Sequence, residues 1–308
     1  MSAYVRYRDL VLDHTLFGWQ TLEGWEESPG LDAADALRQD QHGAWPGRML
    51  AQPRIITLEG LSIRASDRAR LGQAVAAVSR AMAITDTEHP LYVDLDDGRG
   101  LLVAYARPLR RSIPTGRIYT AGRGVIAAEG ALQWSATDPR RYRETESTAT
   151  TGLPEPEDGL EWGPGSEADS GPSVGPLPAP EAGLEWTDGL DWGKGGSAGT
   201  LRAVNDGDAP SDLRIEIHGP VDEPRIVQAS GQMLEYDINL TSRDRLAIDT
   251  REGTVTLNGS ASRLYTATRR SAPERAFTLP PGVNELSFRA KEFSLAARCV
   301  AKWRSAYW

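Results

Sequence analysis

The chain has 308 residues, with 34 Lys and Arg against 43 Asp and Glu and a formal net charge of −9. This length accommodates two domains of about 100 to 150 residues, and the excess of acid argues against holding nucleic acid by counterion release. The single cysteine, Cys299, excludes an intrachain disulfide framework and a cysteine-rich metal site.

The chain begins with charged residues at the positions where a signal peptide would need its apolar segment, among them Arg6, Arg8 and Asp9. No apolar run approaches the ~20 residues of a membrane span. We therefore expect a protein that is made in the cytoplasm, carries no signal peptide and does not insert into a membrane.

Residues 1–142 are predicted to form a mainly β domain. Alternating apolar residues indicate strands at 5–12 and 54–63, the latter interrupted at a glycine. The span 22–38 is acidic and is interpreted as a loop, and residues 43–47 as a turn.

One amphipathic helix is predicted at residues 66–83. Its apolar side chains follow spacings of four, three and four: Leu71, Val75, Val78 and Met82. Ser66 is the expected N-cap, and Asp67 suits the positive end of the helix dipole. A β-hairpin is expected at 91–106, and closing strands at 125–136.

Residues 143–199 form an acidic tract rich in glycine and proline. The tract holds twelve glycines, seven prolines and twelve acidic residues against two basic ones, so the rest of the chain is nearly neutral. Such a composition buries too little apolar surface to offset chain entropy, which favours a linker or insert between two folded domains.

Within this tract the pattern Gly-Leu-acid-Trp occurs three times. Exposed tryptophans are unfavourable because each has ~200 Å² of surface to bury. We therefore weigh a solvated spacer against a segment docked on a domain or a neighbouring subunit. The candidate docking residues are Trp162, Leu184, Trp186, Leu190 and Trp192.

Residues 200–308 are predicted to form an antiparallel β-sandwich. Apolar and polar residues alternate at 213–218, 234–240 and 246–248, and turn signals recur between these runs. Trp303 and the aromatic residues after it are expected to form a last strand packed on the sandwich.

The motifs that suggest chemistry fail on their context. Residues 195–199 match a nucleophile-elbow pattern, but glycine-rich linker precedes them in place of a strand. Residues 94–98 resemble the start of a calcium loop, yet Tyr105 stands where a bidentate Glu is needed. The four histidines are scattered. We predict no catalytic, cofactor or metal site, and a protein that is not an enzyme.

Several short elements, taken in order, resemble the distal tail proteins of long-tailed bacteriophages, the siphovirus-type tail components. They include residues 40–47 leading into 53–60, the segment 134–142, and the segments 246–255 and 279–286. The family-like motif residues are Gly43, Pro46, Trp134, Asp138, Pro139, Tyr142, Asp249, Gly282 and Asn284.

The resemblance implies a ring-forming belt domain at 1–142, commonly hexameric, and a galectin-like sandwich at 200–308. The ring would join the tail tube to tail-tip or baseplate hub proteins in the virion and leave a lumen for DNA. Its implied partners are further copies of the chain, the tube protein, a hub protein and the tape-measure protein, without sequence-specific binding of nucleic acid.

An alternative is a carbohydrate-binding adhesin for host recognition, suggested by the sandwich and the tryptophans of the tract. A galectin-like fold does not by itself imply sugar binding. A hydrolase using Ser197 is a third and much weaker hypothesis.

Overall fold

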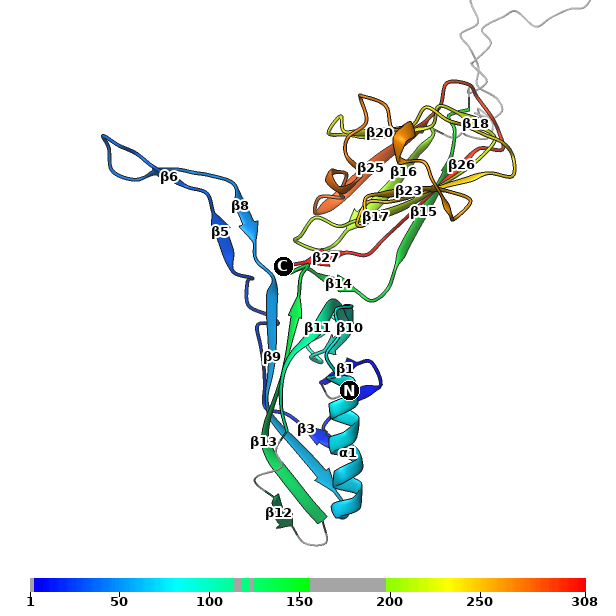
Figure 1. The fold of residues 1–308 in the computed structure, drawn as a ribbon. Coiled ribbons are helices and arrows are strands. Elements are labelled where there is room, and N and C mark those ends of the chain that lie inside the picture. Colours follow the sequence, from blue (N-terminus) through cyan, green and yellow to red (C-terminus); the bar gives the residue numbers. More distant parts are fainter. Residues whose placement is uncertain (1–2, 114–117, 122–123, 156–197) are drawn as a thin grey trace, which may run out of the picture.

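The computed structural model describes residues 3–113, 118–121, 124–155 and 198–308. It confirms the mainly β class, with a β domain carrying one helix and a β-sandwich above it (Figure 1). The galectin-like character of the sandwich stays a prediction.

Eleven of the described strands form the sheet of the N-terminal domain, in the order β2-β1-β10-β11-β13-β9-β3, with β4 on β9, β12 on β13, and β14 between β11 and β27. Their bounds are β1 Tyr4–Tyr7, β2 Leu10–Leu12, β3 Phe17–Gly18, β4 Thr21–Glu23, β9 Arg54–Ala65, β10 His89–Asp94, β11 Leu102–Ser112, β12 Ile118–Ala121, β13 Gly124–Ala136, β14 Arg141–Arg143 and β27 Ala306–Tyr307.

Strand β9 runs without a break through Gly60, where the sequence predicts an interruption. Gly60 has a φ of +67°, and a Cβ there would lie 2.5 Å from the Gln20 side chain. Opposite it, the register with β13 shifts twice. Glycine therefore permits a bulge at a close approach, and one long bent strand results.

Helix α1, Arg68–Ala81, covers one face of this sheet as predicted. Leu71, Val78 and Met82 are buried in the core with the inward side chains of β9. The predicted N-cap is wrong by one residue. Asp67 caps the helix, because its carboxylate accepts the Arg70 N–H at 2.9 Å, whereas the Ser66 hydroxyl donates to that carboxylate. The predicted hairpin is confirmed as the antiparallel pair β10–β11.

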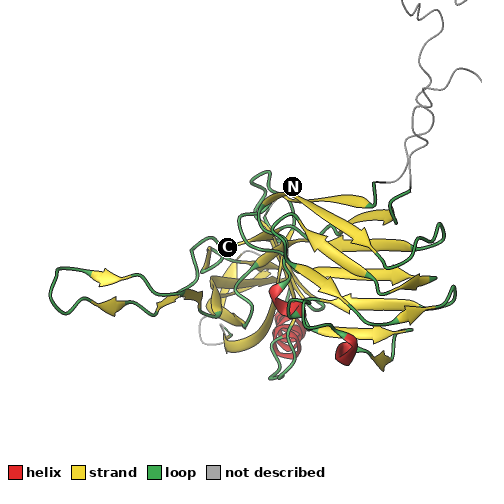
Figure 2. Ribbon diagram, turned by 90° about the horizontal axis from the view of Figure 1, so that it is seen from above, coloured by secondary structure: helices red, strands yellow, loops and turns green. Residues whose placement is uncertain are grey.

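The segment interpreted as a loop and turn is instead a long β-arm. Strand β5 (Leu31–Ala33) pairs with β8 (Met49–Ala51), and β6 (Ala36–Leu37) with β7 (Ala44–Trp45). The arm leaves the body on the side away from α1 and from the sandwich, as both views show (Figures 1 and 2).

The C-terminal domain packs a six-stranded sheet, β15-β26-β17-β22-β23-β24, against a four-stranded one, β16-β25-β19-β20. Their bounds are β15 Ser147–Gly152, β16 Thr200–Asn205, β17 Leu213–His218, β19 Arg225–Gln228, β20 Met233–Glu235, β22 Arg245–Asp249, β23 Thr254–Leu257, β24 Ala261–Ser262, β25 Gly282–Arg289 and β26 Arg298–Trp303. A β18–β21 pair (Val221–Asp222 with Asn239–Leu240) and the 3₁₀ turns η1 (Leu264–Thr266) and η2 (Glu274–Ala276) complete it.

The predicted alternation is confirmed here, because Leu213, Ile215 and Ile217 are all buried between the two sheets. Two features differ from expectation. Strand β15 lies inside the predicted linker and pairs with β26, and it is followed by the buried Leu153. Strand β27 leaves the sandwich and pairs with β14 of the first domain. The chain thus crosses between the domains twice.

Candidate interaction surfaces and interdomain junction

The β-arm, residues 30–52, is held by hydrogen bonds within itself. The Gln52 N–H donates to the Gly30 carbonyl at 2.7 Å, and the Gly47 N–H to the Asp35 carboxylate at 2.7 Å. Near its tip the Arg38 guanidinium lies 4.3 Å from the centre of the Trp45 ring. A two-stranded ribbon is marginally stable in water by itself, so the arm is suited to gain contacts in an assembly.

The apolar side chains of the arm face solvent. Leu37 is 84% exposed, Met49 64% and Trp45 62%, and Leu31 and Leu50 are also exposed. Monomeric proteins rarely leave such a run of large apolar residues uncovered, so the arm has the character of an interaction surface.

A second apolar surface, the α1–β11 groove, lies where the end of α1 meets β11. It encloses about 600 Å³. Its apolar and basic side chains include Met82, Ile84, Leu109, Arg80, Arg110 and Arg111. The register of β11 against β13 shifts between Pro108 and Arg110, and Leu109 is exposed at this bulge.

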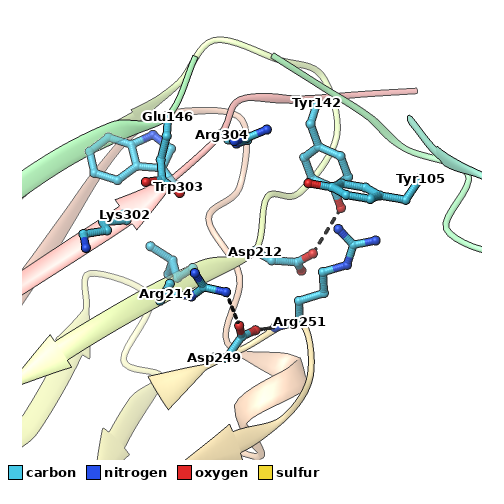
Figure 3. A pocket seen from close by; sticks show the side chains of 11 residues that line it. Tyr105, Tyr142, Glu146, Asp212, Arg214, Asp249, Arg251, Lys302, Trp303 and Arg304 are labelled. Atoms are coloured by element: carbon cyan, nitrogen blue, oxygen red, sulfur yellow. Dashed lines mark hydrogen bonds and ion pairs between the residues drawn. The ribbon is translucent and has the colours of Figure 1, made fainter. Parts of the chain in front are cut away.

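The interdomain junction is built on Arg140, just before β14; Figure 3 shows two of its neighbours, Tyr142 and Asp212. Its guanidinium bonds the Asp138 carboxylate at 2.9 Å, the Asp212 carboxylate at 2.9 Å and the Pro210 carbonyl at 2.8 Å. The Tyr142 hydroxyl donates to Asp138 at 2.7 Å and lies 3.1 Å from Asp212. One cation thus links two carboxylates from different domains.

Electrostatics at this junction favour the ionised carboxylate. Burial by itself would raise the pKa of Asp138, but the hydrogen bond and charge of Arg140, with the Tyr142 hydroxyl, hold that pKa below its usual value. Burial, together with the charge of Asp138, raises the pKa of Tyr142. Tyr142 is therefore a hydrogen-bond donor at physiological pH.

A cleft of about 190 Å³ lies beside these groups, between the domains (Figure 3). Arg251 from the sandwich lies 4.3 Å from the centre of the Tyr105 ring and 3.9 Å from the Asp138 carboxylate. Arg214 bonds Asp249 at 3.0 Å on the sandwich wall of the cleft. The Arg251 cation of one domain therefore faces aromatic rings of the other.

Arg54, the first residue of β9, forms a second polar anchor at the base of the arm. Its Nη1 donates to the carbonyls of Gly24, Trp25 and Glu27, and its Nε donates to the Pro139 carbonyl at 2.7 Å. Burial and the charge of Arg141 lower the pKa of Arg54 to about 10. The arm base and the junction strand are thus tied to one buried cation.

The family-like motif residues fall into separate places. Asp138, Pro139, Tyr142 and Asp249 meet around the junction. Gly43 and Pro46 lie in the arm, where Gly43 has a φ of +97°.

The remaining motif residues, Trp134, Gly282 and Asn284, make packing, turn and hydrogen-bond contacts within their own domains. Trp134 is buried against Tyr7 at a ring distance of 5.8 Å. Gly282 begins β25 with a φ of +94°, and the Asn284 amide donates to the Pro280 carbonyl at 2.8 Å.

The five docking residues predicted in the acidic tract, Trp162, Leu184, Trp186, Leu190 and Trp192, lie outside the described residues, as does the 195–197 part of the elbow pattern. Sequence reasoning missed Arg140, Asp212 and Arg251, which come from three distant segments. It also missed the arm, because the short strands of the arm carry no periodic pattern of apolar residues.

Among the described residues, no three His, Cys, Asp or Glu side chains gather to hold a metal ion. Cys299 is buried, and burial raises the pKa of its thiol to about 12. No helix in the described part of the chain is long and apolar enough to cross a membrane.

Most of the sandwich matches a known family model. Residues 206–307, about a third of the chain, match the family described as siphovirus-type tail component, C-terminal domain. No curated protein sequence matches the chain significantly.

The fold as a whole is similar to that of the Dit protein of phage SPP1, described as a paradigm of the hub adsorption apparatus in Gram-positive infecting phages. The TM-score is 0.65 at 10% identity, over 100% of both chains. Chains from two phage P2 baseplate structures, in the activated conformation with Ca and with Sr, give TM-scores of 0.48 and 0.47 at 11% identity, over 98% and 97% of each chain. The family match and the SPP1 fold confirm the resemblance to siphovirus-type distal tail proteins.

Proposed function

We propose that this protein is a structural, non-enzymatic component of a phage tail tip. Copies of it form a ring, most simply a homo-hexamer, that joins the tail tube to tip or baseplate hub proteins in the virion. DNA passes through its lumen, and the tube, hub and tape-measure proteins are its neighbours. The proposal rests on the family match of the sandwich and on the SPP1 Dit fold.

The β-arm is the observation that carries ring formation. It exposes Leu37, Trp45 and Met49 on a ribbon that extends away from the rest of the molecule (Figure 1). A contact between two different surfaces of identical copies repeats from copy to copy, and it generates a closed ring when the rotation per copy closes.

The face of the N-terminal sheet away from α1 suits a water-filled lumen. Thr57, Glu59, Ser112 and Gln133 line a polar depression there, opposite the face that α1 buries. Gln133 donates to the Thr57 hydroxyl at 3.0 Å. The mixed polar groups offer no base-specific recognition, which a passage for DNA does not require.

Light scattering after size-exclusion chromatography, with negative-stain microscopy, tests the proposal. The purified full chain is measured by itself and with the neighbouring tube protein. Rings in either preparation support it, and a strict monomer in both preparations contradicts it. Millimolar binding of cell-wall sugars by that monomer would favour the adhesin alternative instead.

A further inference from the structure

The α1–β11 groove is an apolar surface with basic groups at its rim. Ile84 is 99% exposed, and Leu109 is exposed at the bulge of β11. Arg111 donates to the Ser79 carbonyl at 2.6 Å, and within the described residues no ion pair involves Arg80; Arg110 also lines the polar depression that contains Glu59. The groove therefore offers a ligand apolar contact and uncompensated positive charge.

The β-arm has the complementary chemistry. Its apolar residues are exposed, and the ribbon carries a small excess of acid, Asp32, Asp35 and Asp40 against Arg38 and Arg48. Opposed charges across an interface favour encounter and fix register, while the apolar side chains supply the burial.

An arm cannot reach the groove of its own chain. It leaves the body on the side of the sheet away from α1 and extends away from it in both views (Figures 1 and 2). Its strands are paired along their length, so it cannot fold back without breaking its own hydrogen bonds. The occupant that fits is the arm of a second copy.

We propose that the β-arm of one copy docks in the α1–β11 groove of the next, with Leu37 and Trp45 against Leu109 and Ile84. This inference rests on the proposed ring, since it assigns the two surfaces of its repeating contact. Each copy then gives one arm and receives another, and both exposed apolar surfaces are covered by a single interface.

Cysteine cross-linking in the full chain tests the pairing. Because Cys299 is buried in β26 with a raised thiol pKa, it gives little background reaction. Leu37→Cys protein is mixed with Leu109→Cys protein, allowed to assemble and treated with a short bismaleimide. The matched control mixes Leu37→Cys with Tyr265→Cys, a 77% exposed position on the sandwich.

A covalent dimer at least tenfold more abundant in the Leu109 mixture than in the control supports the inference. If light scattering shows oligomers but the two mixtures cross-link equally, the groove assignment is overturned while the ring proposal stands. A strict monomer in every mixture, with and without the tube protein, overturns both.

A charge-reversal variant checks the same contact without cysteines. Arg80→Glu should raise the concentration at half-assembly by about threefold, because the groove then loses the cation that faces the net acidic arm. Arg202→Glu, an exposed change on β16, is the control and should leave assembly unchanged. Equal assembly by both variants would overturn the inference.

Discussion

The β-arm and the interdomain junction differ in the kind of side chain that each exposes to water or buries. The arm leaves large apolar side chains in water, whereas the junction takes charged side chains out of it. Both meet at Arg54, which binds carbonyls at the arm base and the carbonyl of Pro139 beside the junction. The junction is complete within one chain, and the arm is not.

This contrast supports the proposal that the arm is the assembly surface. Burying an ion pair costs desolvation free energy, and such a pair is often no more stabilising than apolar packing. Its hydrogen bonds, however, form only in one relative arrangement of the two domains. At the junction they join the sandwich to the N-terminal domain through specific contacts. The arm is held by its own hydrogen bonds but buries little apolar surface within its chain, so it is suited to gain burial from a partner.

The largest expected effect is at the junction. Arg140→Ala leaves the carboxylates of Asp138 and Asp212 without their shared cation, and should lower the free energy of unfolding by about 3 kcal/mol. Arg214→Ala removes an ion pair whose arginine side chain is 60% exposed, and should cost at most about 1 kcal/mol. Urea denaturation of the two variants compares them, and equal losses would refute the contrast.

Two glycines with positive φ, one in the body and one in the arm, allow the cost of adding a side chain to be compared. Gly24, at +74°, lies where a Cβ would stand 1.9 Å from the Ile55 carbonyl oxygen, whereas nothing lies within 4 Å of a Cβ at Gly43 in the arm. Gly24→Ala should cost roughly 3 kcal/mol through overpacking and strain, and Gly43→Ala about 1 kcal/mol through strain. Thermal denaturation separates them, and a reversed order would be incompatible with this geometry.

The arm variant Leu37→Asp should spare the monomer and damage the assembly. Because Leu37 is exposed, the free energy of unfolding should change by no more than about 0.5 kcal/mol. The concentration at half-assembly should rise at least about tenfold, equivalent to about 1.4 kcal/mol. Light scattering over a concentration series measures it, with the exposed sandwich change Tyr265→Asp as control; unchanged assembly would count against the arm.

The smallest effect is the acid response of the junction. The pKa of Asp138 is lower in the folded state than its unfolded value of about 3.9, so its ionised form stabilises the fold above that value. This contribution should be constant between about pH 5 and 7 and be lost as pH falls below about 4, through the lowered folded pKa. The difference in free energy of unfolding between the wild type and Asp138→Asn, measured by urea denaturation, should shrink over that acid range. A difference that grows as the pH falls would contradict a lowered pKa of Asp138.

The sequence by itself determined the elements that bury one face within their own domain. The spacing of Leu71, Val78 and Met82 predicts α1 because a helix repeats its core contacts every 3.6 residues. The alternation of Leu213, Ile215 and Ile217 predicts β17 because a strand presents every second side chain to one face. The ordered turn motifs gave the family resemblance.

Only the tertiary structure decided the arm, β15 and the junction. The arm buries neither face in the monomer, so its strands carry no alternation of apolar and polar residues to detect. Strand β15 was hidden by the composition of the tract that follows it. Arg140 and Asp212 are joined across two domains, and no local pattern encodes a contact between residues so far apart in the chain.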